Sequence, residues 1–500
     1  MNNEDKASTT HPKYDELEPK RAVFSAVMGG TYGVRAMGTK LLPKYPAETD
    51  SDWTARKDAA TIDGLVAVGV ETLCGAVFDG EINTSDVAPA LKKHLEDIDG
   101  KGNSITVMGR NAFKEAMWGC SFLLADPPKA KATDLAEKQA LGIRARVNYY
   151  PAGCVRNWRF GYDSLSKRRY LEMITLMEVS DEPKGHFGLQ RVVRYRVFTV
   201  ENGVVNWELW REVNDAKDQD EKLVLEDQGI VEKVKEIAGE FIGDPCDEPR
   251  LMIETQLEVK AYQKESSFDT IEYLSIPTLV VKGRDNPQQD LALGAATVID
   301  VPVDGDAFYL QIDADGHTSL KGTIDGIKNT IKARVNALID DAEAAEKTAT
   351  QVTVENRDKQ ARLIVWADNF RDSLERVLQF VGQMEGLGDD AAGSIKLVTS
   401  WDKASVSMDP ASVTAEANLT SEGLQSLKSF VEKRHAAGLL PEGVTVEEEM
   451  KRIEEETKAL KPLQNAQQMP GGPNDETNPQ FTQAGQTQGA AQGRGVSESV

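Results

Sequence analysis

The most regular pattern in the sequence is LKGTIDGIKNTIKARVNAL, residues 320–338. Its large apolar side chains recur every three or four residues, which is the period of one helix face. They are Leu320, Ile324, Ile327, Ile331, Val335 and Leu338. The pattern predicts a helix over 314–341 with one apolar seam, roughly 40 Å long at about 1.5 Å per residue.

Three further segments surround this helix. Residues 276–313 contain several Pro and Gly residues and the turn Asp304-Gly305-Asp306, which indicates a small β-rich insert. A second helix is predicted before the insert, over 249–275. After a break at 342–353, apolar side chains again share one face and predict a long helix over 354–386. They are Leu363, Trp366, Phe370, Leu374, Val377 and Val381.

The N-terminal half changes character along its length. Residues 1–20 are polar and charged and are expected to form a flexible arm. Helical patterns then dominate, including a predicted helix over 112–124 that ends at Pro127. From residue 144 to 211 short alternating runs predict an antiparallel sheet, with Asn202-Gly203 as a hairpin turn. The charged stretch 215–227 is predicted to be an exposed loop.

Helix is also predicted over much of 387–463, where Thr445 and Glu448 have the spacing of a capping box. Residues 464–500 are rich in Gln, Gly, Asn and Pro and contain almost no large apolar side chain, so they are expected to be disordered. The whole chain is therefore predicted to be an α+β protein with a mixed body over 21–248.

Charge excludes one class of function. The 500 residues include 58 basic and 81 acidic side chains, a formal charge of −23, which argues against tight, sequence-independent DNA binding. The N-terminal residues do not resemble a signal peptide and no apolar run is long enough to span a bilayer, so a cytosolic site of synthesis is expected. Cys74, Cys120, Cys154 and Cys246 are widely spaced and are expected to be reduced, buried thiols.

No segment specifies an active site. The sequence contains no phosphate-binding loop, no zinc-ligand spacing and no nucleophile elbow. Asp97-Ile98-Asp99-Gly100-Lys101-Gly102 resembles the start of a calcium loop, but Lys101 stands where an oxygen ligand is needed, so a polar turn is favoured. We therefore expect no catalytic residue, no cofactor and no metal ion.

Two groups of residues also allow a binding role, one for a cation and one for nucleic acid. Asp304, Asp306, Asp313 and Asp315 could hold a hard cation, although Asp-Gly pairs are more often turns. Three tryptophans and five arginines in the predicted sheet could face nucleic acid, but strand alternation favours a core or subunit-interface role. They are Trp158, Trp207, Trp210, Arg159, Arg191, Arg194, Arg196 and Arg211.

Several short blocks, in order, resemble the portal-like family of tailed phages that is known only as a domain of unknown function. Each block is weakly specific alone, and together they cover roughly residues 20–460. They are GVRAMG (33–38), LLP (41–43), GAVF (75–78), IDGKG (98–102), LLADPP (123–128), VRNWR (155–159), TLME (175–178), PRL (249–251) and TATQV (348–352). The order of predicted elements also resembles the phage portal fold.

In that fold, the resemblance implies a wing body over 21–248 and two stem helices, 249–275 and 314–341. The β-rich insert 276–313 corresponds to the clip and 342–353 to a loop in the tunnel. Residues 354–386 form a long wing helix, and 387–463 form a C-terminal wing or crown region.

The resemblance implies a portal protein that packages, retains and ejects the genome of a double-stranded DNA phage. About twelve copies would form a ring at the capsid vertex of the virion, assembled in the host bacterial cytoplasm. Implied partners are the terminase large subunit, a head-completion adaptor, the major capsid and scaffolding proteins, and DNA bound transiently. The portal would have no enzymatic activity. Another virion component, such as a scaffold or baseplate protein, and a metal-dependent enzyme are the alternatives.

The same resemblance suggests which side chains meet DNA and which meet partners. Residues on the polar side of the 314–341 helix and in the following loop are the channel-lining candidates. They are Lys321, Asp325, Lys328, Lys332, Asp340, Asp341, Glu343, Glu346 and Lys347. The candidate clip contacts are Asp304, Asp306, Asp313 and Asp315.

Overall fold

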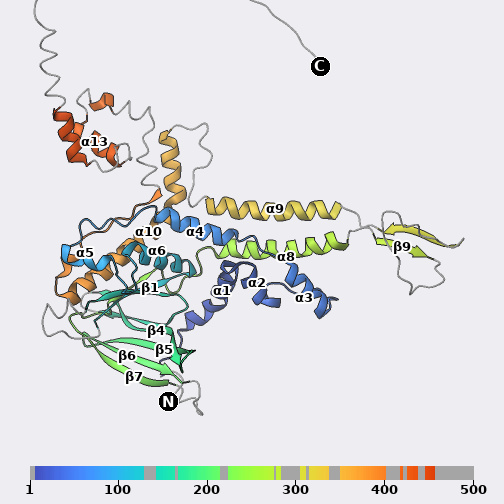
Figure 1. Ribbon diagram of the computed structural model, residues 1–500, viewed down its shortest axis with the longest axis horizontal. Coiled ribbons are helices and arrows are strands. Elements are labelled where there is room, and N and C mark those ends of the chain that lie inside the picture. The colour runs from blue at the N-terminus through green and yellow to red at the C-terminus, as the bar shows by residue number, and fades with distance from the viewer. Residues whose placement is uncertain are drawn as a thin grey trace, which may run out of the picture. The chain divides into compact units, whose positions relative to one another are not determined.

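The computed structural model describes most of the chain, in eleven stretches. They are residues 6–128, 142–163, 167–213, 223–274, 278–282, 304–310, 315–336, 349–400, 417–420, 425–436 and 445–455. Contacts divide the chain into two units, Met1–Ser405 and Val406–Val500. The first unit mixes helices and strands, as expected of an α+β protein (Figure 1).

The N-terminal part of the first unit is helical. Its α-helices are α1 (Pro12–Met28), α2 (Gly30–Ala36), α3 (Asp50–Ala59), α4 (Leu65–Val77), α5 (Pro89–Leu95) and α6 (Ile105–Glu115), with short 3₁₀ turns η2 (Gly38–Lys40) and η3 (Ala116–Trp118). Phe78, Phe113 and Phe370 meet edge to face in the core, with ring centroids 5.3 to 5.8 Å apart. The core therefore joins these helices to a helix more than 250 residues later in the chain.

The predicted flexible arm over 1–20 is wrong from Pro12 onward. His11 caps α1 by accepting a hydrogen bond from the Lys13 N–H at 3.0 Å, and Pro12 occupies the first turn. Tyr14, Leu17, Arg21 and Phe24 follow at helical spacing and are all buried. The charged residues between them lie on the outer face, which gives the segment its polar composition.

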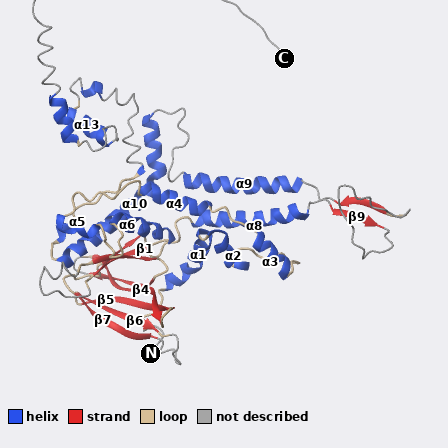
Figure 2. Ribbon diagram, in the orientation of Figure 1, coloured by secondary structure: helices blue, strands red, loops and turns tan. Residues whose placement is uncertain are grey.

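Two antiparallel sheets follow (Figure 2). One has the order β2-β1-β8, built from β1 (Ser121–Asp126), β2 (Arg146–Pro151) and β8 (Gly239–Ile242). The other is a meander of β3 (Val155–Asp163), β4 (Arg168–Lys184), β5 (Gly188–Glu201), β6 (Val204–Glu212) and β7 (Leu223–Val231). Asn202 and Gly203 have φ values of 53° and 75°, as a two-residue hairpin turn between β5 and β6 requires. The predicted antiparallel sheet and its turn are confirmed.

Three further expectations in this region are wrong in part. The helix predicted over 112–124 ends at Glu115, and Ser121–Asp126 is the central strand β1, buried on both faces. A continuous apolar run is compatible with either element. The loop predicted over 215–227 contains the start of the edge strand β7, while 214–222 lies outside the described residues. The four thiols are free, but only Cys74 and Cys120 are buried as predicted. Cys154 is partly buried, and Cys246 is exposed in the loop after β8.

The second half of this unit contains two paired helices, a small hairpin and a long helix. Helix α8 spans Met252–Leu274 and α9 spans Asp315–Asn336. Between them in sequence, β9 (Thr278–Lys282) and β10 (Asp306–Leu310) pair antiparallel. Helix α10 spans Ala349–Glu385 and is followed by η5 (Asp389–Ala392). Helix α10 therefore begins within the segment 342–353 that was expected to be a loop, of which 342–348 lies outside the described residues.

The second unit, taken by itself, contains α13 (Leu427–Ala436) and a helical segment over 446–455. The Glu448 N–H donates to Thr445 Oγ1 at 3.3 Å, and the Thr445 N–H donates to Glu448 Oε2 at 3.1 Å. These reciprocal bonds confirm the predicted capping box. The tail 464–500 lies outside the described residues.

Candidate functional site at the paired helices

Helices α8 and α9 lie side by side and contact each other along much of their lengths (Figure 1). The apolar seam predicted from the sequence provides this contact: Ile324, Ile331 and Val335 of α9 are buried. Helix α9 also contacts α4, where a Cβ placed on Gly69 would lie 3.1 Å from both methyl groups of Val335. The two helices and α4 therefore form one packed group.

The first turn of α4 is capped by a side chain from α8. Glu258 accepts hydrogen bonds from the Leu65 N–H at 2.6 Å and from the Val66 N–H at 2.8 Å. The preceding residue, Gly64, has φ +75° and offers no side chain to do this. The Glu258 carboxylate therefore satisfies two backbone donors that every helix leaves open at its start.

Glu258 is only 1% exposed, so its charge is held in a poorly solvated place. Burial raises the pKa of Glu258, while the N–H groups of Val66, Leu65 and Gly64 act in the opposite direction. The positive end of the α4 dipole also favours a carboxylate at this point.

Lys328 of α9 makes a second connection among the same three elements. Its Nζ lies 2.6 Å from Asp63 Oδ2, just before α4, and also pairs with Glu265 of α8. Burial alone opposes the charge on Lys328, but the hydrogen bonds to Asp63 and Glu265 outweigh it, and the pKa of Lys328 is raised. Lys328, a channel-lining candidate predicted on the polar side of its helix, is partly buried here and bridges two carboxylates, one just before α4 and one on α8.

A third polar contact joins the helices nearer the end of α9. Arg334 Nε donates to Glu254 Oε1 of α8 at 2.5 Å, and the Glu254 side chain is 9% exposed. Glu254, Glu258 and Glu265 all lie on α8, so this one helix supplies a carboxylate to each of the three contacts. We call Glu254, Glu258, Glu265 and Lys328 with their partners the helix clamp.

The other channel candidates are placed differently. Lys321, Asp325 and Lys332 are exposed on α9. Asp340, Asp341, Glu343, Glu346 and Lys347 lie outside the described residues. Among the described residues, the channel-lining candidates that are both basic and exposed on α9 are therefore Lys321 and Lys332.

The acidic cluster of the β-rich insert is only partly described. Asp304 and Asp306 are exposed at the start of β10, where Asp306 pairs in register with Lys282 of β9. Asp315 is the first residue of α9, and Asp313 lies outside the described residues. Within the part of the chain that the structure describes, no group of three or more acidic, His or Cys side chains is arranged to hold a metal ion.

The loop that resembled a calcium site is a polar turn. Asp99 Oδ1 accepts from the Lys101 N–H at 2.9 Å, and Asp97 Oδ1 accepts from the Gly102 N–H at 2.7 Å. The carboxylates thus bind the loop's own backbone.

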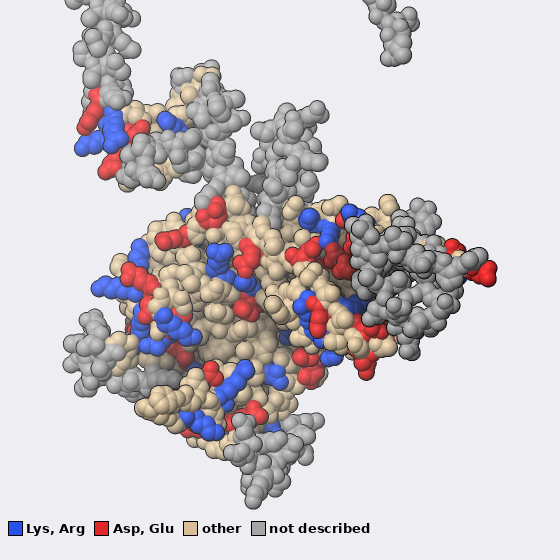
Figure 3. Space-filling view, turned by 45° about the vertical axis from the view of Figure 1, so that its right-hand side comes forward, with Lys and Arg blue, Asp and Glu red and all other residues tan. Residues whose placement is uncertain are grey.

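Several arginines of the larger sheet pair with carboxylates. Arg196 is buried and pairs with Asp126 at 2.9 Å, and Arg194 pairs with Glu182 and Glu226. Trp158 is buried and stacks on His11 at 4.1 Å. On the face drawn in Figure 3, basic and acidic side chains are interspersed. These observations favour the core and interface interpretation of the sheet over nucleic-acid binding.

Sequence reasoning missed the helix clamp. Glu258 and Val66 are 192 residues apart, and an isolated glutamate in a helix carries no signal that it caps another. One local feature does indicate that α4 needs a cap from elsewhere: the residue before it is Gly64, which has no side chain to cap the helix as Ser, Thr, Asp or Asn would.

Comparisons with known proteins bear on this region. A family model described as Domain of unknown function (DUF4055) matches residues 254–384, which run from the first turn of α8 to the end of α10. No curated protein matches the chain. The chain is similar to one in a solved structure titled "Neck of empty GTA particle computed with C6 symmetry", with 11% identity and a TM-score of 0.33. That similarity covers 82% of this chain and 99% of the other.

Among the residues that the structure describes, no helix is both long enough and apolar enough to cross a lipid bilayer.

Proposed function

We propose that the chain is the portal subunit of a tailed double-stranded DNA phage. One observation carries the proposal: α8, the β9-β10 hairpin, α9 and the long helix α10 follow one another in the order stem, clip, stem and wing helix. The family model matches this same stretch, residues 254–384. The packing of α8 on α9 supports the assignment of the pair as a stem.

In the proposed ring, about twelve copies repeat each axial side chain around a channel. Lys321 and Lys332, both exposed, would then form bands of positive charge in a chain of net charge −23. Such bands attract phosphates weakly and are screened by salt, which suits DNA that must slide. The helix clamp would keep each stem in a constant position relative to its own wing while DNA passes.

The remaining parts of the proposal concern partners. The β9-β10 hairpin, as the clip, would bind the terminase large subunit during packaging and a head-completion adaptor afterwards. The wing would contact the major capsid and scaffolding proteins. The portal would assemble in the host cytoplasm and remain in the virion. Catalysis of ATP hydrolysis would belong to the terminase, and the chain itself would be no enzyme.

The first test is negative-stain electron microscopy of the purified chain, combined with a mass measurement of the particles. Rings with a central hole and about twelve subunits are the expected result. A monomer that persists across salt and protein concentrations would overturn the proposal and favour another virion component.

A further inference from the structure

Strands β4 and β5 continue together beyond the rest of their sheet. The last pairs that they make with their outer neighbours are Leu176 with Val155 of β3 and Arg194 with Arg211 of β6. Among the described strands, none pairs with β4 and β5 past these residues, so 179–193 forms a two-stranded ribbon. A two-stranded ribbon is only marginally stable in water by itself, and a contact at its tip would stabilise it.

The tip of this ribbon, residues 184–189, is apolar and basic. Phe187 in the turn is 94% exposed, and Leu189 at the start of β5 is 71% exposed. Lys184, the last residue of β4, is also exposed. No acidic residue occurs between positions 183 and 193, although the chain has a net charge of −23. A phenylalanine ring exposed to this extent leaves hydrophobic free energy to be gained by contact with another surface.

A cavity of about 810 Å³ lies at the other end of β4. Its wall includes Arg169, the second residue of β4, and three aromatic side chains, Phe160 of β3, Phe241 of β8 and Trp366 of α10. The three aromatic side chains are half-buried, and Val365 beside them is 53% exposed. The cavity therefore offers apolar surface on which a further aromatic ring can pack.

Acidic groups dominate the charge of this cavity. Its lining contains five carboxylates and three arginines. Two of the arginines already lie over aromatic rings of the wall, Arg169 at 3.6 Å and Arg250 at 4.4 Å from the ring centres. Partial burial and the neighbouring Asp244 raise the pKa of the exposed Asp247, because Arg250 does not fully compensate for them. A cation brought to this rim would be attracted.

The ribbon tip and the cavity lie too far apart to meet within one chain. Arg169 and Lys184 stand near opposite ends of the same strand. At about 3.3 Å per residue they are separated by roughly 50 Å. Two different, complementary surfaces on opposite ends of one subunit are what a head-to-tail ring requires, because each subunit uses one surface for each of its neighbours.

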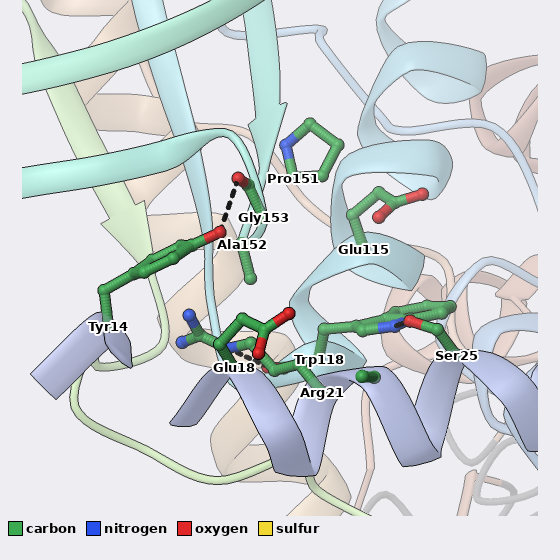
Figure 4. Close-up of a pocket in the computed structure, with 10 residues that line it drawn as sticks. Tyr14, Glu18, Arg21, Ser25, Glu115, Trp118, Pro151, Ala152 and Gly153 are labelled. Carbon is green, nitrogen blue, oxygen red and sulfur yellow. Dashed lines mark hydrogen bonds between the residues drawn. The ribbon is translucent and has the colours of Figure 1, made fainter. Parts of the chain in front are cut away.

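A smaller cavity, of about 350 Å³, does not meet this requirement (Figure 4). It is bordered by residues 151–153, just before β3 begins, and so lies toward the ribbon end of the sheet. Its wall contains the Arg21 guanidinium, which donates to the carbonyl oxygens of Trp118 at 3.1 Å and Pro245 at 3.3 Å. Because of its place, it cannot serve as the far surface of a head-to-tail contact.

We infer that the ribbon tip of one copy inserts Phe187 into the aromatic cavity of the next copy, with Lys184 beside Asp247 at the rim. The occupant is a second copy because the chain itself carries both surfaces, with opposite local charge and at opposite ends of one strand. The pairing of Lys184 with Asp247 also offsets, at this contact, the repulsion between copies of net charge −23. The inference rests on the proposed ring and names a contact that joins its subunits.

Photo-crosslinking of the full chain tests the contact directly. Phe187 is replaced by p-benzoylphenylalanine, which keeps an aromatic ring at this exposed position, and isotope-labelled and unlabelled subunits are mixed before assembly. Irradiation should yield covalent dimers, with crosslinked peptides that join labelled to unlabelled chain and lie within 240–250 or 365–376. The same replacement of Tyr32 on α2, which is 84% exposed, is the control and should give no such peptides.

The outcomes separate this inference from the proposed function. Rings that form without crosslinks to the cavity peptides would overturn the inference and leave the proposed portal role standing. A chain that remains monomeric under all conditions would overturn both.

A charge exchange provides a second test. Lys184→Glu and Asp247→Lys should each raise the protein concentration at which half of the chain is in rings, by about tenfold. The double variant should return this concentration toward the wild-type value, and because the two positions are roughly 50 Å apart in one chain, recovery can arise only between copies. Lys40→Glu, at an exposed position of η2, is the control for charge alone. Losses that add in the double variant, or equal losses in Lys40→Glu, would contradict the contact. Thermal melting shows whether each variant is folded, and the crosslink at position 187 depends on neither charge variant.

Discussion

The Glu258 carboxylate of α8 accepts a hydrogen bond from the Val66 N–H of α4 at 2.8 Å, across 192 residues of sequence. This contact makes the start of one helix depend on the position of another.

Glu258→Ala should therefore leave the N–H groups of Leu65 and Val66 without an acceptor and lower the free energy of unfolding by about 2–3 kcal/mol. Glu258→Gln retains one acceptor oxygen and should lose less. Thermal and denaturant unfolding would measure both. Gln256→Ala, at an exposed position of the same helix, is the control, and an equal loss there would mean that the cap contributes nothing.

The same carboxyl predicts a pH dependence. Burial raises the pKa of Glu258 above the usual value of about 4.3, so the folded protein holds this proton more tightly than the unfolded chain. The contribution of Glu258 to the free energy of unfolding is thus fully present when the pH is below the pKa of the unfolded chain. It declines as the pH rises through the higher pKa of the folded protein. Wild-type protein should gain melting temperature relative to Glu258→Gln as the pH is lowered from 7 to 4. A difference between the two proteins that does not vary with pH would contradict the assignment.

Lys328 provides a separate test of the helix clamp. Lys328→Met leaves Asp63 and Glu265 facing each other without a cation, and stability should fall by about 1–2 kcal/mol. Adding Glu265→Gln should recover part of this loss, because it removes one of the two stranded charges. Lys332→Met, at an exposed position of α9, should change stability by less than about 0.5 kcal/mol. Failure of the double variant to recover would show that Lys328 acts by packing rather than by charge.

These tests concern the part of the molecule that sequence patterns described least well. The seam from Leu320 to Val335 predicts α9 because a helix face repeats within a few residues, and Asn202-Gly203 predicts its turn because the required backbone angles are local. Leu123 and Leu124 fall within a predicted helix because an apolar run has no period of its own, and pairing with β2 and β8 makes the run a strand. Glu258 and Lys328 have the composition of an exposed helix surface. Their burial is set by α4, which is distant in sequence, so no local pattern reveals it.

Gly119 shows why the predicted helix cannot continue into β1. It has φ +110°, and a Cβ at this position would lie 2.4 Å from the Asp247 carbonyl oxygen. Gly119→Ala should therefore cost at least about 2–3 kcal/mol, from backbone strain and a contact that cannot relax. Gly75→Ala is the matched change within helix α4, where nothing lies within 4 Å, and it should stabilise the protein by up to about 1 kcal/mol. The two melting temperatures should move in opposite directions, and a common direction would contradict this account of Gly119.

Lys321 and Lys332 connect the structure with the proposed channel. Both side chains are exposed on α9, so replacing them with Gln should leave folding and ring formation unchanged. If the lysine bands guide DNA, phage particles assembled with the double variant should contain less nuclease-protected DNA, and the defect should resemble that of wild type at raised salt, where such attraction is screened. Lys40→Gln, an exposed change on η2, is the control for loss of charge alone. Normal packaging by rings that carry the double variant would show that α9 does not present these lysines to DNA. A defect shared with Lys40→Gln would indicate a general effect of net charge, since a chain that is already acidic becomes more so with every lysine removed.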